Sequence, residues 1–350
     1  MQPTRPTIAD VAQRAGVSKG LVSFALNGRP GVSGSTRDRI LAAASELGWQ
    51  PSIRARSLSV GKAFALGLVI ARDPAIIAAD PFFPAFISGV EQELSRSGSV
   101  LMLAMVPTAE QEAETYRTLA KDRRVDGVFV SDLRFDDERI GLLAELGIPA
   151  VTLGHAETPG PHPAVTVDDG PGIRAAVEHL VGLGHRRIAH VAGTPTLLHG
   201  GRRRAEFEAA MHAARLEPAG IVPTDFTATA GARATVLLLD SPEPPTAIVY
   251  ANDPMAIAGM SVAQSRGLSV PRELSVIGFD GSDIGRHLDP RLTSVATDIQ
   301  SWGRAACRAL LDHIDGVEVS DLELAPARLL DGDSTAPPPD VAPVPGAATT

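Results

Sequence analysis

The sequence predicts a small all-α head, a short hinge helix and a larger, two-lobed α/β domain. Three observations lead to this prediction. The first fifty residues contain three short helical patterns, and a two-turn segment lies between Pro51 and Gly61. From Ala65 onwards, apolar strands alternate with amphipathic helices in two successive series. With 350 residues, the chain has room for two or three domains.

The head begins with a predicted pair of helices between Thr7 and Asn27. Apolar residues recur at i, i+3 and i+4 from Ile8, Gly16 permits a tight turn, and Ser18 suits the N-cap of the second helix. Two helices around such a turn can place the second one in the major groove of DNA. A generic αα-hairpin is the alternative.

A third helix is predicted from Thr36 to about Leu47, with Ser35 as its N-cap and Gly48 just beyond its end. These three helices complete the predicted helix-turn-helix head, residues 1–50. A head of this size has a small core and is only marginally stable alone.

Residues 51–62 form the predicted hinge helix and linker. A helix of two turns is mostly unfolded in water unless it packs against a partner. Arg54 and Arg56 suit contacts with phosphates, and Leu58 suits insertion at a base step in the minor groove. A solvated linker is the alternative.

Charge is distributed unevenly along the chain. Residues 1–62 contain nine Lys and Arg against three Asp and Glu, a net charge of +6. Because the whole chain carries −9, the remainder carries −15. A basic head on an acidic body is the distribution that phosphate binding by the head requires.

The α/β domain is predicted over residues 63–331, with the Pro/Gly-rich stretch 157–163 between its two lobes. The expected lobes are 63–160 with 294–318 for the first, and 164–291 with 320–331 for the second. Strand ends of two such lobes face each other across a cleft, which is a favoured place for a small ligand. The Pro/Ala/Thr-rich tail, residues 332–350, is predicted to be disordered.

Composition excludes several classes of protein. No apolar run is long enough to span a membrane, and the N-terminus lacks the apolar core of a signal peptide. Cys307 is the single cysteine, so neither an intrachain disulfide nor a cysteine metal cluster is expected. These features predict a cytoplasmic protein with no membrane partner.

Seven motifs stand in one order along the chain: TIADVAQRAGVSKGLVSFALN, VSGSTRDRILAAASELGWQPSIRARSL, DPFFPAFISGVE, VTVDDG, HLVGLGHRRIAHVAG, YANDPMA, and VPRELSVIGFD with LDPRLTSV. Over residues 7–330 they resemble the LacI/GalR family of bacterial transcriptional regulators. The resemblance implies a nucleoid-associated repressor with an effector domain similar to periplasmic sugar-binding proteins. It implies a homodimer on pseudo-palindromic double-stranded operator DNA, a small-molecule effector, expected to be a sugar, and no cofactor.

The resemblance also implies a set of DNA-binding residues. Lys19, Gly20 and Phe24 occupy positions where the family usually reads bases. Phenylalanine cannot bond guanine but can contact a thymine methyl group, and packing of Phe24 on the hinge or head is the alternative. Ala55 would pack two hinge helices together, and Leu58 would enter the minor groove. The other implied contacts to DNA, including phosphate contacts and caps, are Thr7, Ser18, Leu21, Ser23, Asn27 and Arg54.

For the effector, the resemblance implies Arg203 as a clamp, Asn252 as an amide ligand and Asp280 as an acceptor of sugar hydroxyls. The remaining implied ligands are Asp169 at the crossover between the lobes and three aromatic residues, Phe82, Phe83 and Phe226. Each has an ordinary structural alternative. Asp280 could cap the following turn, Phe83 could belong to the core, and Arg203 could be a surface residue.

Two other classes of protein are alternatives to a regulator. An enzyme could use His155, His185 and Asp280, but the sequence has no nucleophile elbow, P-loop or HExxH motif. A stand-alone sugar-binding protein would need a signal peptide and would not need residues 1–60. The sequence therefore favours a regulator without enzyme activity.

Overall fold

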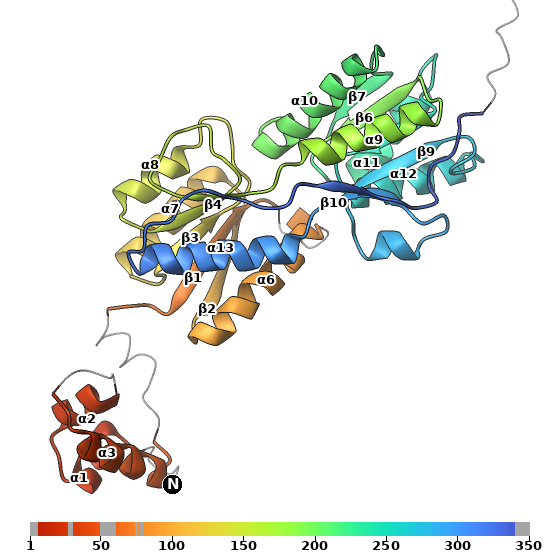
Figure 1. The fold of residues 1–350 in the computed structure, drawn as a ribbon. Coiled ribbons are helices and arrows are strands. Elements are labelled where there is room, and N and C mark those ends of the chain that lie inside the picture. The colour runs from red at the N-terminus through yellow and green to blue at the C-terminus, as the bar shows by residue number, and fades with distance from the viewer. Residues whose placement is uncertain (1–5, 27–30, 50–60, 74–75, 78–79, 340–350) are drawn as a thin grey trace, which may run out of the picture. The chain divides into compact units, whose positions relative to one another are not determined.

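The computed structural model describes residues 6–26, 31–49, 61–73, 76–77 and 80–339. The chain divides into two compact units, Met1–Phe64 and Ala65–Thr350 (Figure 1). Asn27 and the predicted hinge residues Arg54, Ala55 and Leu58 lie outside the described residues. No described helix is both long and apolar enough to cross a bilayer.

Three helices form the head: α1 (Ile8–Ala15), α2 (Lys19–Leu26) and α3 (Gly34–Glu46). Their shared apolar core consists of Val11, Ala12, Ala15, Val22, Ala25, Ile40, Ala43 and Ala44. Gly16 ends α1 with φ +65°, and the Ser18 hydroxyl accepts the Leu21 N–H at 3.2 Å, as the predicted turn and cap require.

The cap of α3 differs from the prediction. Ser33, rather than Ser35, is the N-cap, and its Oγ accepts the Thr36 N–H at 3.3 Å. Ser33 has the extended backbone that an N-cap needs, whereas Ser35 already lies inside the first helical turn.

The first lobe is a sheet between two helical layers, with strand order β11-β5-β4-β3-β1-β2. All neighbouring strands in it are parallel. Its strands are β1 (Ala65–Ala71), β2 (Val100–Val106), β3 (Gly127–Val130), β4 (Ala150–Leu153), β5 (Ala164–Thr166) and β11 (Leu322–Glu323). Its helices are α6 (Phe82–Ser97), α7 (Ala109–Lys121), α8 (Glu138–Glu145) and α13 (Ile299–Ile314). The inner strands β1, β3 and β4 read as continuous apolar runs because helices cover both faces of the sheet there.

The second lobe repeats this architecture with strand order β12-β10-β9-β8-β6-β7, in which only the β10–β12 pair is antiparallel. Its strands are β6 (Ile188–Ala192), β7 (Gly220–Pro223), β8 (Ala247–Tyr250), β9 (Ser275–Asp280), β10 (Thr293–Ala296) and β12 (Arg328–Leu330). Its helices are α9 (Gly170–Gly182), α10 (Leu198–Ala213), α11 (Ala228–Leu239), α12 (Asp253–Ser265) and the short 3₁₀ helix η1 (Ile284–His287).

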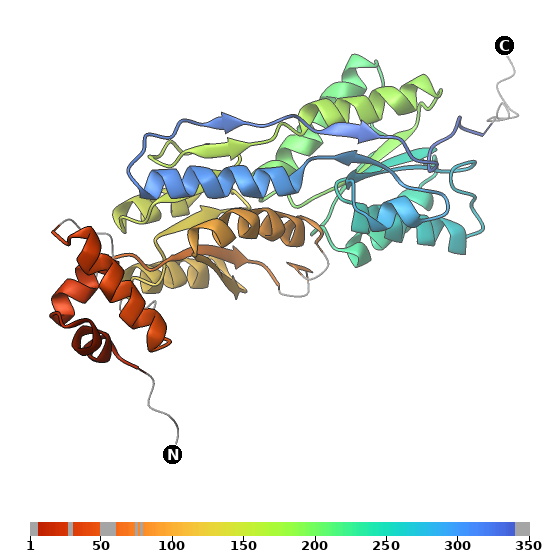
Figure 2. The same ribbon diagram turned by 60° about the horizontal axis from the view of Figure 1, so that its bottom comes forward.

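The structure corrects the predicted bounds of the lobes. β5 and β11, predicted in the second lobe, pair with each other in the first sheet, whereas β10, predicted in the first lobe, pairs with β9 in the second. The chain therefore crosses between the lobes three times, at residues 167–169, 297–298 and 324–327. Figure 2 shows the last crossing as the blue chain between β11 and β12. The Pro/Gly stretch 157–163 misled the prediction because it is a loop between two strands of one sheet.

Helix α13 reaches the first lobe from the far end of the sequence and packs closely on α6. Gly89 of α6 and Gly303 of α13 face each other so closely that a Cβ at either position would collide with the backbone of the other helix. α13 contributes Ala306, Cys307 and Leu310 to the first core. The first lobe is therefore complete only when this late segment is in place.

Part of the tail is ordered, which contradicts the prediction of disorder for residues 332–339. Ser334 is fully buried; its Oγ donates to the Val276 carbonyl at 2.6 Å and accepts the Thr293 N–H at 2.8 Å. The His185 ring lies 2.9 Å from the Ala336 carbonyl oxygen. These bonds fix the segment on the second lobe, and composition alone cannot reveal them. Residues 340–350 lie outside the described residues.

Candidate functional site

The exposed face of α2 carries the residues that the sequence associates with DNA. Ser18, Lys19, Gly20 and Phe24 are all exposed, with Phe24 at 42%. Phe24 is therefore not part of the head's apolar core. Among the other implied DNA contacts, Leu21 and Ser23 are half-buried and Thr7 is exposed.

Thr7 begins α1 and also serves a local structural purpose. Its N–H and its hydroxyl both donate to the Asp10 carboxylate, at 2.7 and 2.8 Å. These bonds lower the pKa of Asp10 and fix the start of the first helix. The Thr7 side chain remains exposed beside this cap.

A cavity of about 350 Å³ lies between the two lobes of the second unit. All seven residues that the sequence assigns to the effector line it: Phe82, Phe83, Asp169, Arg203, Phe226, Asn252 and Asp280. Its volume is in the range of small-ligand sites. Most of its polar residues lie at or just after the carboxyl ends of parallel strands, where ligands bind in folds of this class.

Arg203 lies on the second lobe's side of the cavity and has three contacts that hold it in place. Its Nε donates to Asp169 Oδ2 at 2.7 Å and its Nη1 donates to the Ala251 carbonyl at 2.9 Å. The guanidinium carbon lies 3.5 Å from the centre of the Phe279 ring. With 13% of its side chain exposed, Arg203 is not a surface residue and faces the cavity in a fixed orientation.

Asp280 ends β9 beside a second acidic residue, Asp253. Its Oδ2 accepts the Asp253 N–H at 3.4 Å, in the first turn of α12, rather than capping the turn that follows it. The Asp253 carboxylate accepts shorter bonds, from Ser294 Oγ and Ser282 N, both at 2.6 Å. Burial raises the pKa of Asp280 well above its usual value, and the charges of Asp253 and Asp80 raise it further.

Asn252 and Phe226 are linked to each other. The Asn252 Oδ1 accepts the Met255 N–H at 3.0 Å as N-cap of α12, and its Nδ2 donates to the Phe226 carbonyl at 2.8 Å. Phe226 adopts a positive φ of +69°, and its ring lies 5.2 Å from that of His199. Asn252 therefore positions the aromatic wall of the cavity, and it keeps further hydrogen-bonding capacity for a ligand.

The aromatic residues of the first lobe pack in its apolar core and also line the cavity. Phe83 is 2% exposed and belongs to the first core, as its structural alternative proposed, and it also lines the cavity. Phe82 packs edge-on against Trp302 at 5.7 Å between ring centroids. Flat rings at a cavity wall suit the apolar face of a sugar.

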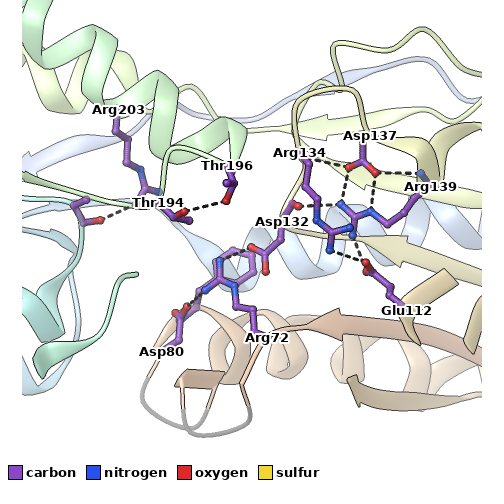
Figure 3. A network of polar contacts seen from close by, with 12 residues as sticks. Arg72, Asp80, Glu112, Asp132, Arg134, Asp137, Arg139, Thr194, Thr196 and Arg203 are labelled. Carbon is purple, nitrogen blue, oxygen red and sulfur yellow. Dashed lines mark hydrogen bonds and ion pairs between the residues drawn. The ribbon is translucent and has the colours of Figure 1, made fainter. Parts of the chain in front are cut away.

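Several cavity residues were not predicted from the sequence. They are Arg72, Asp80, Ser131, Asp132, Asp168, His199, Arg202 and Trp302. Arg72 directly follows β1, and Ser131 and Asp132 directly follow β3, so their positions at strand ends were the available signal. Figure 3 shows Arg72 between Asp80 and Asp132.

The histidines give no catalytic arrangement. His155 and Asp280 line the cavity, but His185 does not; it bonds Thr246 and Ser275 inside the second lobe. Burial and nearby arginines lower the pKa of His199 well below its usual value, so this ring is neutral at pH 7. Among the described residues, no group of His, Cys, Asp and Glu suits a metal ion.

Two family models match the chain. Residues 7–52 match the model described as bacterial regulatory proteins, lacI family. Residues 177–335 match a periplasmic binding protein-like domain. The first match covers the head and the second covers most of the second lobe together with α13.

Named transcriptional regulators are similar to this protein over nearly the whole chain. The HTH-type transcriptional regulator CelR of Thermobifida fusca is 33% identical, over 91% of this chain and 95% of that protein. The HTH-type transcriptional repressor CytR of Escherichia coli K12 is also 33% identical, over 91% and 92%.

Solved structures of regulators are also similar to this chain over nearly its whole length. The lac repressor dimer bound to operator and the anti-inducer ONPF has a TM-score of 0.83 at 27% identity, over 95% of this chain and all of that one. The CelR–cellobiose complex has a TM-score of 0.72 at 32% identity, over 94% and 100%. The chain belongs to the lacI family of bacterial regulatory proteins.

Proposed function

We propose that this protein represses transcription by binding operator DNA through its head, and that an uncharged carbohydrate in the cavity between the lobes switches its affinity for DNA. One observation carries the proposal: the seven residues assigned to the effector from the sequence line a single cavity of about 350 Å³. The relative CelR, solved with cellobiose, supports a carbohydrate of that kind as the first ligand to test.

The chemistry of the cavity supports a polyhydroxylated ligand. Arg203 offers fixed donors, the Asp280 carboxyl group bonds hydroxyls, and Phe82 and Phe226 present rings for the apolar face of a sugar. Asp169 holds Arg203 in place, so the clamp is preorganised before the ligand arrives. The cavity therefore offers the hydrogen-bond donors, the acceptor and the aromatic rings that a sugar ring can contact.

On DNA, we assign base contacts to the exposed face of α2. Lys19 would bond base edges or phosphates, and Phe24 would contact a thymine methyl group. Gly20 brings the helix backbone close to the groove without a side chain of its own. The sequence adds phosphate contacts from Arg54 and a minor-groove wedge from Leu58, and both remain proposals.

We propose that coupling follows from the three crossings between the lobes. A ligand that contacts both lobes favours one angle between them, and in a homodimer this angle sets the separation of the two hinge segments. Typical coupling free energies between such sites are about 1–3 kcal/mol. The protein would exert this control in the cytoplasm, on nucleoid DNA.

Fluorescence anisotropy with labelled genomic fragments tests the function. The full chain should bind a fragment from upstream of its own gene at nanomolar concentrations and lose about 5- to 150-fold in affinity, or gain it, when a binding sugar is added. Arg203→Lys should bind DNA equally well and respond less to the sugar. The proposal fails if no genomic fragment is bound, or if no sugar that binds the protein changes DNA affinity.

A further inference from the structure

Arg72 lines the cavity from the first lobe, and Figure 3 shows it beside Asp80 and Asp132. It directly follows β1, and only 12% of its side chain is exposed. Its Nη1 donates to Asp80 Oδ2 at 3.2 Å and its Nη2 donates to Asp132 Oδ1 at 2.6 Å. The two carboxylates fix the plane of the guanidinium and compensate its charge.

The guanidinium also contacts both lobes. Its carbon lies 5.8 Å from the centre of the Phe83 ring in the first lobe and 5.7 Å from that of Phe226 in the second. These distances are within the range of cation–π attraction. Because Phe226 moves with the second lobe, the surroundings of Arg72 depend on the angle between the lobes.

Two buried oxygen atoms belong to the residues that directly follow β3, Ser131 and Asp132. Among the described residues, neither Asp132 Oδ2 nor Ser131 Oγ has a hydrogen-bond partner, and both residues line the cavity. Asp132 is held with φ at +51°. An unsatisfied buried polar atom is unfavourable, and a ligand hydroxyl would remove that penalty.

We infer that Arg72 and Asp132 together recognise two neighbouring hydroxyl groups of an uncharged sugar and disfavour its phosphate ester. This inference rests on the proposed function and deepens it. A guanidinium beside a carboxylate presents a donor next to an acceptor, and each of two adjacent hydroxyls both donates and accepts. The Phe83 and Phe226 rings flank this pair and would contact the carbon atoms between the hydroxyls.

Charge explains the exclusion of phosphate. Arg72 already pairs with two carboxylates and Arg203 pairs with Asp169, so a phosphate bound at either of these two arginines would have to displace an existing partner. It would also meet other acidic residues of the wall, Asp168, Glu206 and Glu323. An uncharged polyol meets none of this repulsion.

Isothermal titration calorimetry on the full chain tests the inference with cellobiose, maltose and xylobiose, and with the 6-phosphate of cellobiose. The tightest neutral sugar should bind Arg72→Met about 10- to 100-fold more weakly than the wild type. Arg72→Lys should recover little, because an ammonium lacks the planar fork. Asp132→Asn, which keeps the shape, should also bind more weakly, and cellobiose 6-phosphate should bind the wild type at least 10-fold more weakly than cellobiose.

Arg134→Met is the matched control. Arg134 pairs with the buried Glu112 in the same lobe but does not line the cavity, so its loss should leave sugar affinity unchanged. Unchanged affinity in Arg72→Met and Asp132→Asn, or equal affinity for cellobiose and its phosphate, would overturn the inference and leave the proposed function standing. A wild-type protein that binds none of the three neutral sugars would overturn both. The phosphate comparison needs no variant, so it holds even if Arg72→Met fails to fold.

Discussion

Arg203 lies over the ring of Phe279, with its guanidinium carbon 3.5 Å from the centre of the ring. Asp169 holds the same group from the side at 2.7 Å. Stacking and a charge-assisted hydrogen bond together fix an arginine far better than a lysine. The clamp that we propose for the effector is therefore rigid because of its neighbours and not because of its own side chain.

Replacing this clamp should weaken effector binding. Arg203→Lys loses the stack and the fork, and we expect an affinity lower by about 1.5–3 kcal/mol, measured by calorimetry with cellobiose or the tightest sugar. Arg204→Lys is the matched control, because Arg204 pairs with Glu208 outside the cavity. Equal losses of sugar affinity in the two variants would show that Arg203 does not bind the effector.

Asp280→Asn should make the unliganded protein more stable at neutral pH. The raised pKa means that native Asp280 keeps a proton that the unfolded chain releases above about pH 4. Stability therefore falls as pH rises from that value towards the native pKa, and asparagine removes this loss. The melting temperature of Asp280→Asn should exceed that of the wild type at pH 7.5, and the difference should shrink at pH 5.

Asp283→Asn serves as control for this pH dependence, since Asp283 is a highly exposed carboxylate three residues away. It should shift the melting temperature little at either pH. The buried Asp253 still titrates in Asp280→Asn, so the pH dependence of stability should diminish rather than vanish. A wild-type-like pH profile in Asp280→Asn would contradict the assigned protonation.

Arg139→Met should strongly destabilise the first lobe. Arg139 bonds the buried Glu112 at 2.8 Å and the buried Asp137 at 2.6 Å (Figure 3). Burial alone would raise the pKa of Asp137, but the hydrogen bonds and charge of Arg139 lower it. Removing the arginine leaves Asp137 buried without a cation and leaves Glu112 with Arg134 alone, and we expect a loss of about 3–5 kcal/mol in the free energy of unfolding by urea.

The comparison with Arg134→Met makes this expectation specific. Arg134 also bonds Glu112, at 2.6 Å, but is 24% exposed and leaves Glu112 paired with Arg139 when it is removed. Arg134→Met should lower the free energy of unfolding by about 1 kcal/mol. If both variants were equally destabilised, the network would not depend on its buried arginine.

Truncation should separate the two parts of the tail. Deleting residues 332–350 removes the buried Ser334 and leaves the Thr293 N–H and the Val276 carbonyl without their partners. We expect the melting temperature to fall by several degrees, since each unsatisfied buried group costs about 1–3 kcal/mol. Deleting only 340–350 should leave it unchanged, and equal effects would show that 332–339 adds no stability.

Phe24 should determine one base pair of the operator. Selection of random DNA by the wild-type protein should show no guanine preference that depends on position 24, and Phe24→Arg should introduce one, because arginine bonds guanine in two places. Phe24→Ala should relax the preference at that base pair. If Phe24→Ala selects the same sequence as the wild type, Phe24 does not contact bases.

The sequence predicted the alternation of strands and helices well because the inner strands of both sheets are apolar runs buried on both faces. The resemblance to the LacI/GalR family also implied Arg203, Asp169 and Asp280 as effector ligands, and all three line the cavity. Arg72 and Asp132 were not predicted because each stands among a few polar residues after an apolar strand and belongs to no motif that marks a ligand site. Only their meeting across β1 and β3 reveals the pair.

The assignment of strands to lobes could not be predicted for a related reason. β5, β10 and β11 are short, and their partners are decided by register with distant strands. Local composition favours a boundary at a Pro/Gly stretch, but the pairing of Thr152 with Ala164 crosses it. The order in residues 332–339 likewise depends on hydrogen bonds to Thr293 and Val276 that composition does not encode.

The late arrival of α13 has a consequence for synthesis on the ribosome. When residues 65–166 have emerged, the first sheet has all its strands except β11, but the apolar face that α13 covers is open to water. The second lobe must be translated almost completely before residues 299–314 can close that face. The nascent chain therefore carries an exposed apolar surface while residues 167–314 are translated, so a ribosome-associated chaperone would meet the first lobe before its own helix does.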